Sequence, residues 1–232
     1  MKKLSISIPS HDGKQFDAYL SLPPTGRGPG LLIIQEIWGV NEHIRAVADQ
    51  YAMDGYVVVA PDVFWRQQAN VDLKYDEADT KHAYRLMQNL DGPNTVADLV
   101  ATAQALRNRA EVGGRVGAVG YCMGGRLAYQ LAATGAIDAA VCYYGGGIQN
   151  VLDIAPSIQV PILFHYGELD AHIPAAAVSA VQQAFAGRTN ALVHVYAGAD
   201  HGFNCWGRPM YNQRASALAR GRTLQWLSAQ LA

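Results

Sequence analysis

Gly120-Tyr121-Cys122-Met123-Gly124-Gly125 is the stretch that decides how the rest of the chain is interpreted. Before it, Arg115–Val119 form a short, mostly apolar run typical of a buried strand, and after it Arg126–Ala133 are rich in helix-forming residues. A strand, a sharp turn bracketed by glycines and a helix are the setting of a nucleophile elbow. The residue exposed at such a turn is Cys122 here, where serine is usual. The pattern therefore predicts an α/β fold that presents a thiol at the start of a helix.

The thiol of Cys122 would lie at the positive end of that helix. Unpaired backbone N–H groups and the helix dipole there favour a thiolate, and later an oxyanion. The alternative is a small buried apolar residue, a common environment for a free cysteine. Cys142 fits this alternative because it lies within the apolar run Ala139–Tyr143, whereas Cys122 is flanked by glycines at a turn. We therefore interpret Cys122 as a nucleophile.

Composition sets the broad class of the protein. The 232 residues are 50% hydrophobic and 16% charged, with a net charge of −1, which fits one globular α/β domain spanning residues 1–232. No basic excess favours nucleic acid or an anionic membrane as a partner, and no segment has the apolar length of a membrane span or export signal. Three cysteines without paired spacing fit a reducing cytoplasm. No metal-binding motif occurs, so we expect no metal or other cofactor. We expect the chain to be a monomer or a small homo-oligomer.

Strand and helix patterns alternate along the chain. Two N-terminal segments alternate apolar and polar residues and are separated by a turn signal. This pattern predicts an antiparallel hairpin at a sheet edge. Apolar strand runs and helical stretches then predict a mostly parallel sheet with helices on both faces. Residues 63–75 lack periodicity and are expected to form an irregular loop over one end of the sheet, as a lid or as a wall of a pocket. The expected strands are 4–8, 16–22, 30–34, 56–60, 115–119, 139–143, 161–166 and 191–196, and the expected helices are 42–53, 76–89, 94–109, 126–133, 175–185 and 211 to the end.

Four reactive side chains follow predicted strands. Ligands of such sheets bind beyond the carboxyl ends of the strands, so Glu36, Cys122, Asp170 and His201 are all expected at one end of the sheet. The order nucleophile, acid, histidine is also that of the α/β-hydrolases. The sequence therefore predicts a triad of Cys122, His201 and Asp170.

Other side chains compete for two of these roles. Asp170 could instead cap the helix that follows it, and Glu168 and Asp200 are rival carboxylates for orienting His201. Among the seven histidines, His201 has the loop position that a catalytic histidine needs. The others are expected in strands of the core (His165 and His194) or in surface and loop positions (His11, His43, His82 and His172).

Several motifs together resemble one family. The chain is similar to the dienelactone hydrolases (carboxymethylenebutenolidases), a branch of the α/β-hydrolases whose nucleophile is cysteine. The order and spacing of the motifs resemble the family along nearly the whole chain. The motifs are Gln35-Glu36-Ile37-Trp38-Gly39-Val40-Asn41, Ala60-Pro61-Asp62, the Cys122 elbow, Tyr143-Tyr144-Gly145 and His201-Gly202-Phe203.

The resemblance implies a mechanism. Glu36 would lie near the resting thiol and take its proton when substrate binds, after which the thiolate of Cys122 attacks the lactone carbonyl. Ring opening would give an acyl-enzyme and an enolate. The enolate, or His201 held in its tautomer by Asp170, would then promote hydrolysis by water.

The oxyanion of that reaction also needs donors. By the same resemblance they would be the backbone N–H groups of Ile37 and Met123. A thiolate is strongly nucleophilic without continuous help from a base. Activated esters and enol-lactones are therefore expected substrates, and amides are not.

The chain differs from the family at two positions that bind the carboxylate of the substrate. Members that act on the chlorocatechol-derived dienelactone carry two arginines for the substrate carboxylate, and the matching positions here are Thr80 and Cys205. Nearby cations could substitute or be ordinary solvated charges, and nearby aromatic residues could line the pocket. These candidate substrate-binding residues are Lys81, Arg85 and Arg208, with Tyr84, Tyr144 and Trp206.

The sequence therefore predicts a cysteine-dependent hydrolase of a small lactone or activated ester. Two alternatives stay open on the same residues. One is a hydrolase of a different small ester without dienelactone activity. The other is a non-catalytic, hydrolase-like sensor of small molecules, or a thiol sensor that uses Cys122.

Overall fold

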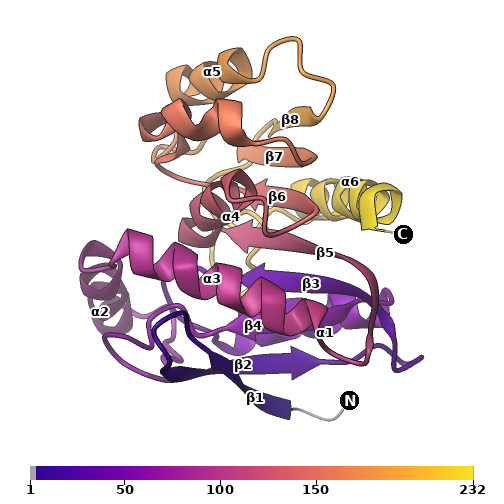
Figure 1. The fold of residues 1–232 in the computed structure, drawn as a ribbon. Helices are drawn as coiled ribbons and strands as arrows, with labels where there is room; N and C mark the ends of the chain where they lie inside the picture. Colours follow the sequence, from indigo (N-terminus) through magenta and orange to yellow (C-terminus); the bar gives the residue numbers. More distant parts are fainter. Residues whose placement is uncertain (1–3, 232) are drawn as a thin grey trace.

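A mixed sheet of eight strands runs through the computed structural model, which describes residues 4–231 (Figure 1). The strand order is β1-β2-β4-β3-β5-β6-β7-β8, with β1–β2 and β2–β4 antiparallel and the other pairs parallel. The hairpin expected at the N-terminal edge is confirmed. The strands are β1 (Leu4–Pro9), β2 (Gln15–Ser21), β3 (Gly28–Ile34), β4 (Val57–Pro61), β5 (Val112–Tyr121), β6 (Ala139–Tyr143), β7 (Ile162–Gly167) and β8 (Ala191–Tyr196).

Helices cover both faces of this sheet. α1 and α6 pack on one face and α3 and α4 on the other, with α5 beyond α4 at the β8 edge (Figure 1). Burial on both faces explains the apolar runs in the central strands, where Leu31–Ile34 and Val57–Ala60 are fully buried. The helices are α1 (Glu42–Met53), α2 (Glu77–Gln88), α3 (Gly92–Arg107), α4 (Met123–Ala133), α5 (Ala175–Ala184) and α6 (Gln213–Leu231).

Side-chain caps fix where three of these helices begin. Asn41, Asp76 and Asp91 each accept a hydrogen bond from a backbone N–H in the first turn of the following helix. The start of α3 differs from the expectation of a helix over residues 94–109, because α3 begins at Gly92. With Asp91 as the cap, Pro93 falls in the first turn, where its missing N–H costs nothing.

The segment between β4 and α2 is irregular, as expected, but it is firmly held. Asp62 accepts hydrogen bonds from the backbone N–H groups of Phe64 at 3.0 Å and Asn70 at 2.6 Å. Arg66 reaches Asp98 of α3 at 2.7 Å, in an ion pair that is largely buried. An isolated bridge between Gly39 and Asp72 joins this loop to the loop after β3. The loop therefore forms a fixed wall beside the carboxyl end of the sheet.

Two short 3₁₀-helices were missed by the sequence reading. They are η1 (Ile148–Asn150) and η2 (Leu152–Ser157), which follow β6 where no helix was expected. All three cysteines are free, in agreement with their unpaired spacing. Within residues 4–231, no helix combines the length and apolar character needed to cross a membrane.

Candidate active site

The elbow forces Cys122 into an unusual backbone conformation. Its φ is 56° and its ψ −117°, between the end of β5 and the first residue of α4. This conformation is unfavourable for a residue with a side chain and persists only where its surroundings impose it. A Cβ on Gly120 would overlap the carbonyl oxygen of Gly124, and a Cβ on Gly124 would overlap that of Ile34. The glycines of the motif are therefore required by the close approach of α4 to β3 and β5.

The structure brings Cys122, His201 and Asp170 together. The sulfur of Cys122 lies 3.1 Å from Nε2 of His201, and Nδ1 of the same ring lies 2.7 Å from Oδ2 of Asp170. Cys122 is partly exposed, whereas Asp170 is buried. The three segments expected at one end of the sheet thus converge with hydrogen-bonding geometry.

The competition between carboxylates is also resolved in this arrangement. The second oxygen of Asp170 accepts the backbone N–H groups of His172 at 2.9 Å and Ile173 at 3.1 Å, so this residue caps its loop and orients His201 at once. Glu168 instead accepts the N–H of Gly198 near the surface. Asp200 accepts the backbone N–H of His201, and among the described residues it makes no hydrogen bond to the His201 ring.

The environment of His201 favours its protonated form. Burial opposes a positive charge there, but the sulfur of Cys122 and the carboxylate of Asp170 outweigh it and raise the pKa of His201 to about 10. When both ring nitrogens of His201 carry protons, Nε2–H can donate to the sulfur of Cys122 while Nδ1–H donates to Asp170.

A cavity of about 350 Å³ opens over the thiol. Ile37 and Met123 border it beside Cys122, as required of residues whose N–H groups would hold an oxyanion. Met123 is the first residue of α4, so its N–H has no acceptor within the helix. The remaining lining residues are Trp38, Tyr84, Met87, Arg126, Gly146, Gly147, Gln149, Asn150, His172, His201 and Arg208.

The candidate substrate-binding residues divide into two groups. Tyr84 and Arg208 line the cavity. Tyr144 does not reach it, because its ring is fully buried behind His201, with the two ring centroids 5.2 Å apart. Lys81 pairs with Glu77 on the outer face of α2.

Two further candidates also lie outside the cavity. Arg85, on the exposed side of α2, contacts His82 through Nη2. Trp206 packs against His43 at 4.2 Å between ring centroids, on the far side of the loop after β8. Their sequence positions predicted that these residues lie near the site. The orientations of α2 and of the loop after β8 instead direct both side chains away from the cavity.

Arg208 is positioned by residues that the sequence reading treated separately. Thr80, at one of the positions where relatives carry arginine, accepts a hydrogen bond from Nε1 of Trp38 at 3.2 Å. The guanidinium of Arg208 lies 4.6 Å from the centroid of the Trp38 ring. Nη1 of Arg208 is buried without a hydrogen-bond partner among the described residues. Arg208 therefore places a cation at the wall of the cavity and keeps one buried donor without a partner among the described residues.

Sequence reasoning missed two charged or titratable residues of the cavity. Arg126 lies one helical turn after Cys122 and has its guanidinium against Gly147. His172 packs edge-on against His201, with ring centroids 5.0 Å apart. The spacing of Arg126 from the nucleophile was a usable signal, whereas His172 is placed by a loop that no pattern specifies.

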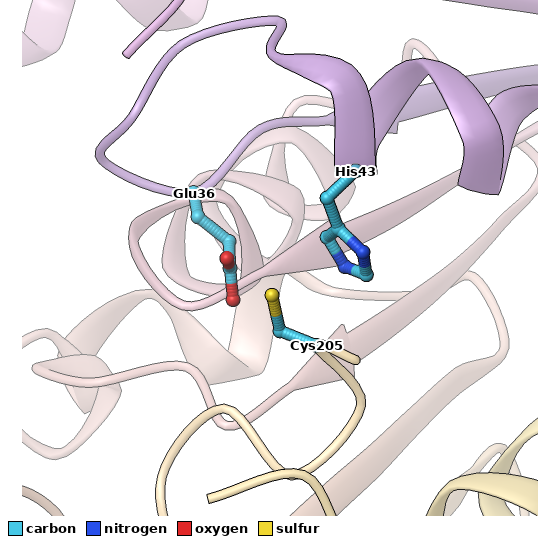
Figure 2. A group of neighbouring side chains, drawn as sticks. All are labelled: Glu36, His43 and Cys205. Carbon is cyan, nitrogen blue, oxygen red and sulfur yellow. The ribbon is translucent and has the colours of Figure 1, made fainter. Parts of the chain in front are cut away.

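Glu36 does not contact the thiol in this structure. Both of its carboxyl oxygens lie buried without a hydrogen-bond partner within residues 4–231. Burial raises the pKa of Glu36, and the positive charges of Arg208 and His201 oppose that rise. Figure 2 shows the carboxylate turned toward His43 and Cys205. The role of Glu36 as acceptor of the thiol proton therefore stays a prediction.

Comparisons with known proteins agree with the family resemblance. The dienelactone hydrolase family matches residues 16–231. A carboxymethylenebutenolidase of Pseudomonas putida is 38% identical over 224 residues, which are 96% of this chain and 95% of that protein. A putative carboxymethylenebutenolidase of Azospirillum brasilense is 37% identical over 229 residues, 97% and 98% of the two chains.

A solved structure supports the fold in the same way. The crystal structure of a putative dienelactone hydrolase from Klebsiella pneumoniae superposes with a TM-score of 0.87 at 31% identity, covering 98% of each chain. The resemblance and the α/β-hydrolase fold expected from the sequence are thus confirmed.

Proposed function

Because the chain belongs to the dienelactone hydrolase family, whose members hydrolyse carboxylic esters and lactones, we propose that it cleaves a small lactone or activated ester through a thioester on Cys122. The observation that carries this proposal is the 3.1 Å contact between the Cys122 sulfur and Nε2 of His201. A thiolate in such a pair is ready to attack without a prior proton transfer.

The first half of the reaction makes the thioester. The sulfur of Cys122 bonds to the carbonyl carbon, and the carbonyl oxygen takes the negative charge, held by the N–H groups of Ile37 and Met123. When the tetrahedral intermediate collapses, the carbon–oxygen bond of the ester or lactone breaks. Nε2–H of His201 protonates the departing oxygen, so the imidazole becomes neutral.

The second half releases the acid. Neutral His201 takes a proton from a water molecule, whose oxygen attacks the thioester carbon. The carbon–sulfur bond then breaks, which restores the thiolate of Cys122 beside a protonated His201. Asp170 keeps the ring in the orientation that presents Nε2 to both reacting atoms.

A second proton acceptor is Glu36, as the family resemblance implies. Its carboxyl group would have to rotate toward Cys122 to act, because the carboxyl oxygens make no hydrogen bond to the thiol in this structure. The geometry favours His201, so we assign the resting thiolate to the His201 pair. Glu36 would then matter only for a thiol that has lost this contact.

The cavity favours an acyl group that carries a carboxylate. Arg208 and Arg126 both line it, and neither has a salt-bridge partner among the described residues. Arginine offers paired donors that match a carboxylate. These two residues replace the pair expected at positions 80 and 205, and Tyr84 adds a hydroxyl at the rim. This proposal assigns no role in substrate binding to Lys81, Arg85, Trp206 or Tyr144.

A hydrolysis screen tests the proposal. Dienelactones, uncharged lactones and aryl esters are compared with the wild-type chain, Cys122→Ser and Arg208→Met. We expect Cys122→Ser to lose most activity on every substrate. Arg208→Met should raise KM about 10–100-fold for carboxylated substrates, the range expected for a lost charge-assisted hydrogen bond, and leave uncharged aryl esters unchanged.

Other outcomes of the screen identify the rival functions. Turnover of uncharged esters with no dienelactone activity would make the chain a hydrolase of a different small ester. Binding without turnover would favour a small-molecule sensor. The cytoplasmic location and the monomeric or small homo-oligomeric state stay predictions.

A further inference from the structure

Three potential metal ligands converge in the interior behind the active site. Glu36 comes from the loop after β3, His43 from the first turn of α1 and Cys205 from the loop after β8 (Figure 2). Their ligand atoms all lie within 4.8 Å of one another, and all three side chains are buried. The sequence reading expected no metal, since residues so far apart form no local motif, and it placed His43 at the surface. His43 is in fact 3% exposed.

Two members of this cluster lack the partners that buried polar groups require. Both carboxyl oxygens of Glu36 and both ring nitrogens of His43 have no hydrogen-bond partner within the described part of the chain. Leaving such a group unsatisfied costs about 1–3 kcal/mol, and more when the group is charged. Glu36 and His43 each offer one of these unsatisfied atoms to the same cluster, which indicates a missing occupant.

The chemistry of the donors selects the class of occupant. We propose that Glu36, His43 and Cys205 bind one zinc ion. A thiolate, an imidazole and a carboxylate are the ligands zinc uses, whereas magnesium and calcium prefer oxygen alone. Ligand atoms about 2.0–2.3 Å from zinc lie up to ~4 Å apart, so small side-chain rotations would close the present spacing.

The surroundings accommodate this ion. Neither ring nitrogen of His43 has a competing hydrogen bond among the described residues, so one of them is available to a metal. The Glu36 carboxylate and a Cys205 thiolate, whose proton leaves to solvent, together cancel the charge of the ion. The occupied site as a whole then carries no net charge beside Arg208. The fourth position falls to water or to the hydroxyl of Tyr75, which lies 3.2 Å from the Cys205 sulfur.

The proposed zinc site is distinct from the thiolate–imidazolium pair. Cys122 and His201 are occupied with each other and with Asp170. A zinc ion held by Glu36 would keep that carboxylate away from Cys122. The inference does not depend on the hydrolase proposal, because metal binding is measured without substrate.

Cobalt substitution tests the site on the full chain. The protein is stripped with a chelator, titrated with Co²⁺ and followed by absorption, since a cobalt–thiolate bond gives a charge-transfer band and a tetrahedral site gives intense visible bands. We expect one Co²⁺ per chain, displaced by Zn²⁺. Cys205→Ser should abolish the charge-transfer band, and His43→Phe should weaken Zn²⁺ binding beyond the roughly 10–100-fold that loss of an outer-shell partner costs.

Matched cysteine variants identify which sulfur binds the Co²⁺ ion. Cys122→Ala and Cys142→Ala should both keep the band, because neither removes a proposed ligand. A band lost in Cys122→Ala and kept in Cys205→Ser would overturn the proposal and place the ion on the catalytic pair. So would the absence of stoichiometric binding to wild type. Circular dichroism of each metal-free variant shows whether it is folded, and His43→Phe gives an independent answer if Cys205→Ser is not.

Discussion

The charge of His201 depends on the two groups that its ring contacts, Cys122 and Asp170. The sulfur is one of the causes that raise the pKa of His201 to about 10, well above the ordinary 6.5. A folded-state pKa raised in this way contributes stability that is fully present below about pH 6.5 and is lost as pH rises through about 10. The protonated form of His201, which donates a proton to the leaving group, is lost as pH rises through the same value.

Removal of the sulfur should therefore change how His201 titrates. In Cys122→Ala we expect the pKa of His201 to fall by about 1–3 pH units, because an opposite charge in contact is removed while burial remains. An NMR titration of the ring measures this, with Cys142→Ala as the control. An unchanged pKa in Cys122→Ala would show that the thiolate–imidazolium pair does not exist.

Asp170 should matter far more than its rival Glu168. Asp170→Asn keeps the shape but presents an amide to Nδ1, so kcat/KM on an aryl ester should fall by about 10²–10⁴-fold. Glu168→Gln should leave it within about twofold, since Glu168 only accepts a surface N–H from Gly198. Equal losses in the two variants would remove Asp170 from its assigned role.

At the scale of elements, the fit of α4 against β3 determines whether the elbow forms. Residues 120–125 predict this arrangement from sequence because only glycine tolerates the contact with the Ile34 carbonyl. η1 and η2 carry no comparable pattern and were not predicted. The rotation of α2 about its axis directs Lys81 and Arg85 away from the cavity. This rotation depends on packing that no short motif encodes.

Two glycine substitutions should have opposite effects. A Cβ at Gly124 meets the backbone of Ile34 and Gln35, so Gly124→Ala should destabilise the fold by about 1–3 kcal/mol. A Cβ at Gly221, on the exposed side of α6, meets nothing within 4 Å, so Gly221→Ala should stabilise by about 0.5–1 kcal/mol. Denaturant unfolding measures both. Two changes of the same sign would contradict this account of the elbow.

At the scale of the whole molecule, one sheet and one core connect the chain from β1 to β8. The positions of the strands along the chain and the candidate triad were predictable, because they follow from apolar runs and the residues that end them. The convergence of residues 36, 43 and 205 was not, since it depends on how two loops and the first turn of α1 pack together. The same holds for Arg208, whose position over Trp38 no spacing encodes.

The continuous core predicts a single cooperative unfolding transition. Tryptophan fluorescence and far-ultraviolet circular dichroism should give coincident curves, with a heat-capacity change of about 3 kcal/mol/K for a chain of 232 residues. Two separated transitions would instead divide the chain into independent units.

The thioester on Cys122 is the claim on which the proposed function rests most heavily. Rapid mixing of the wild-type chain with a chromogenic aryl ester, followed by acid quench and mass spectrometry, measures it directly. We predict a burst of about one aryl alcohol per chain and an acyl group on the peptide that contains Cys122, with neither in Cys122→Ala. A burst that persists in Cys122→Ala, or an acyl group on any other residue, would contradict the account.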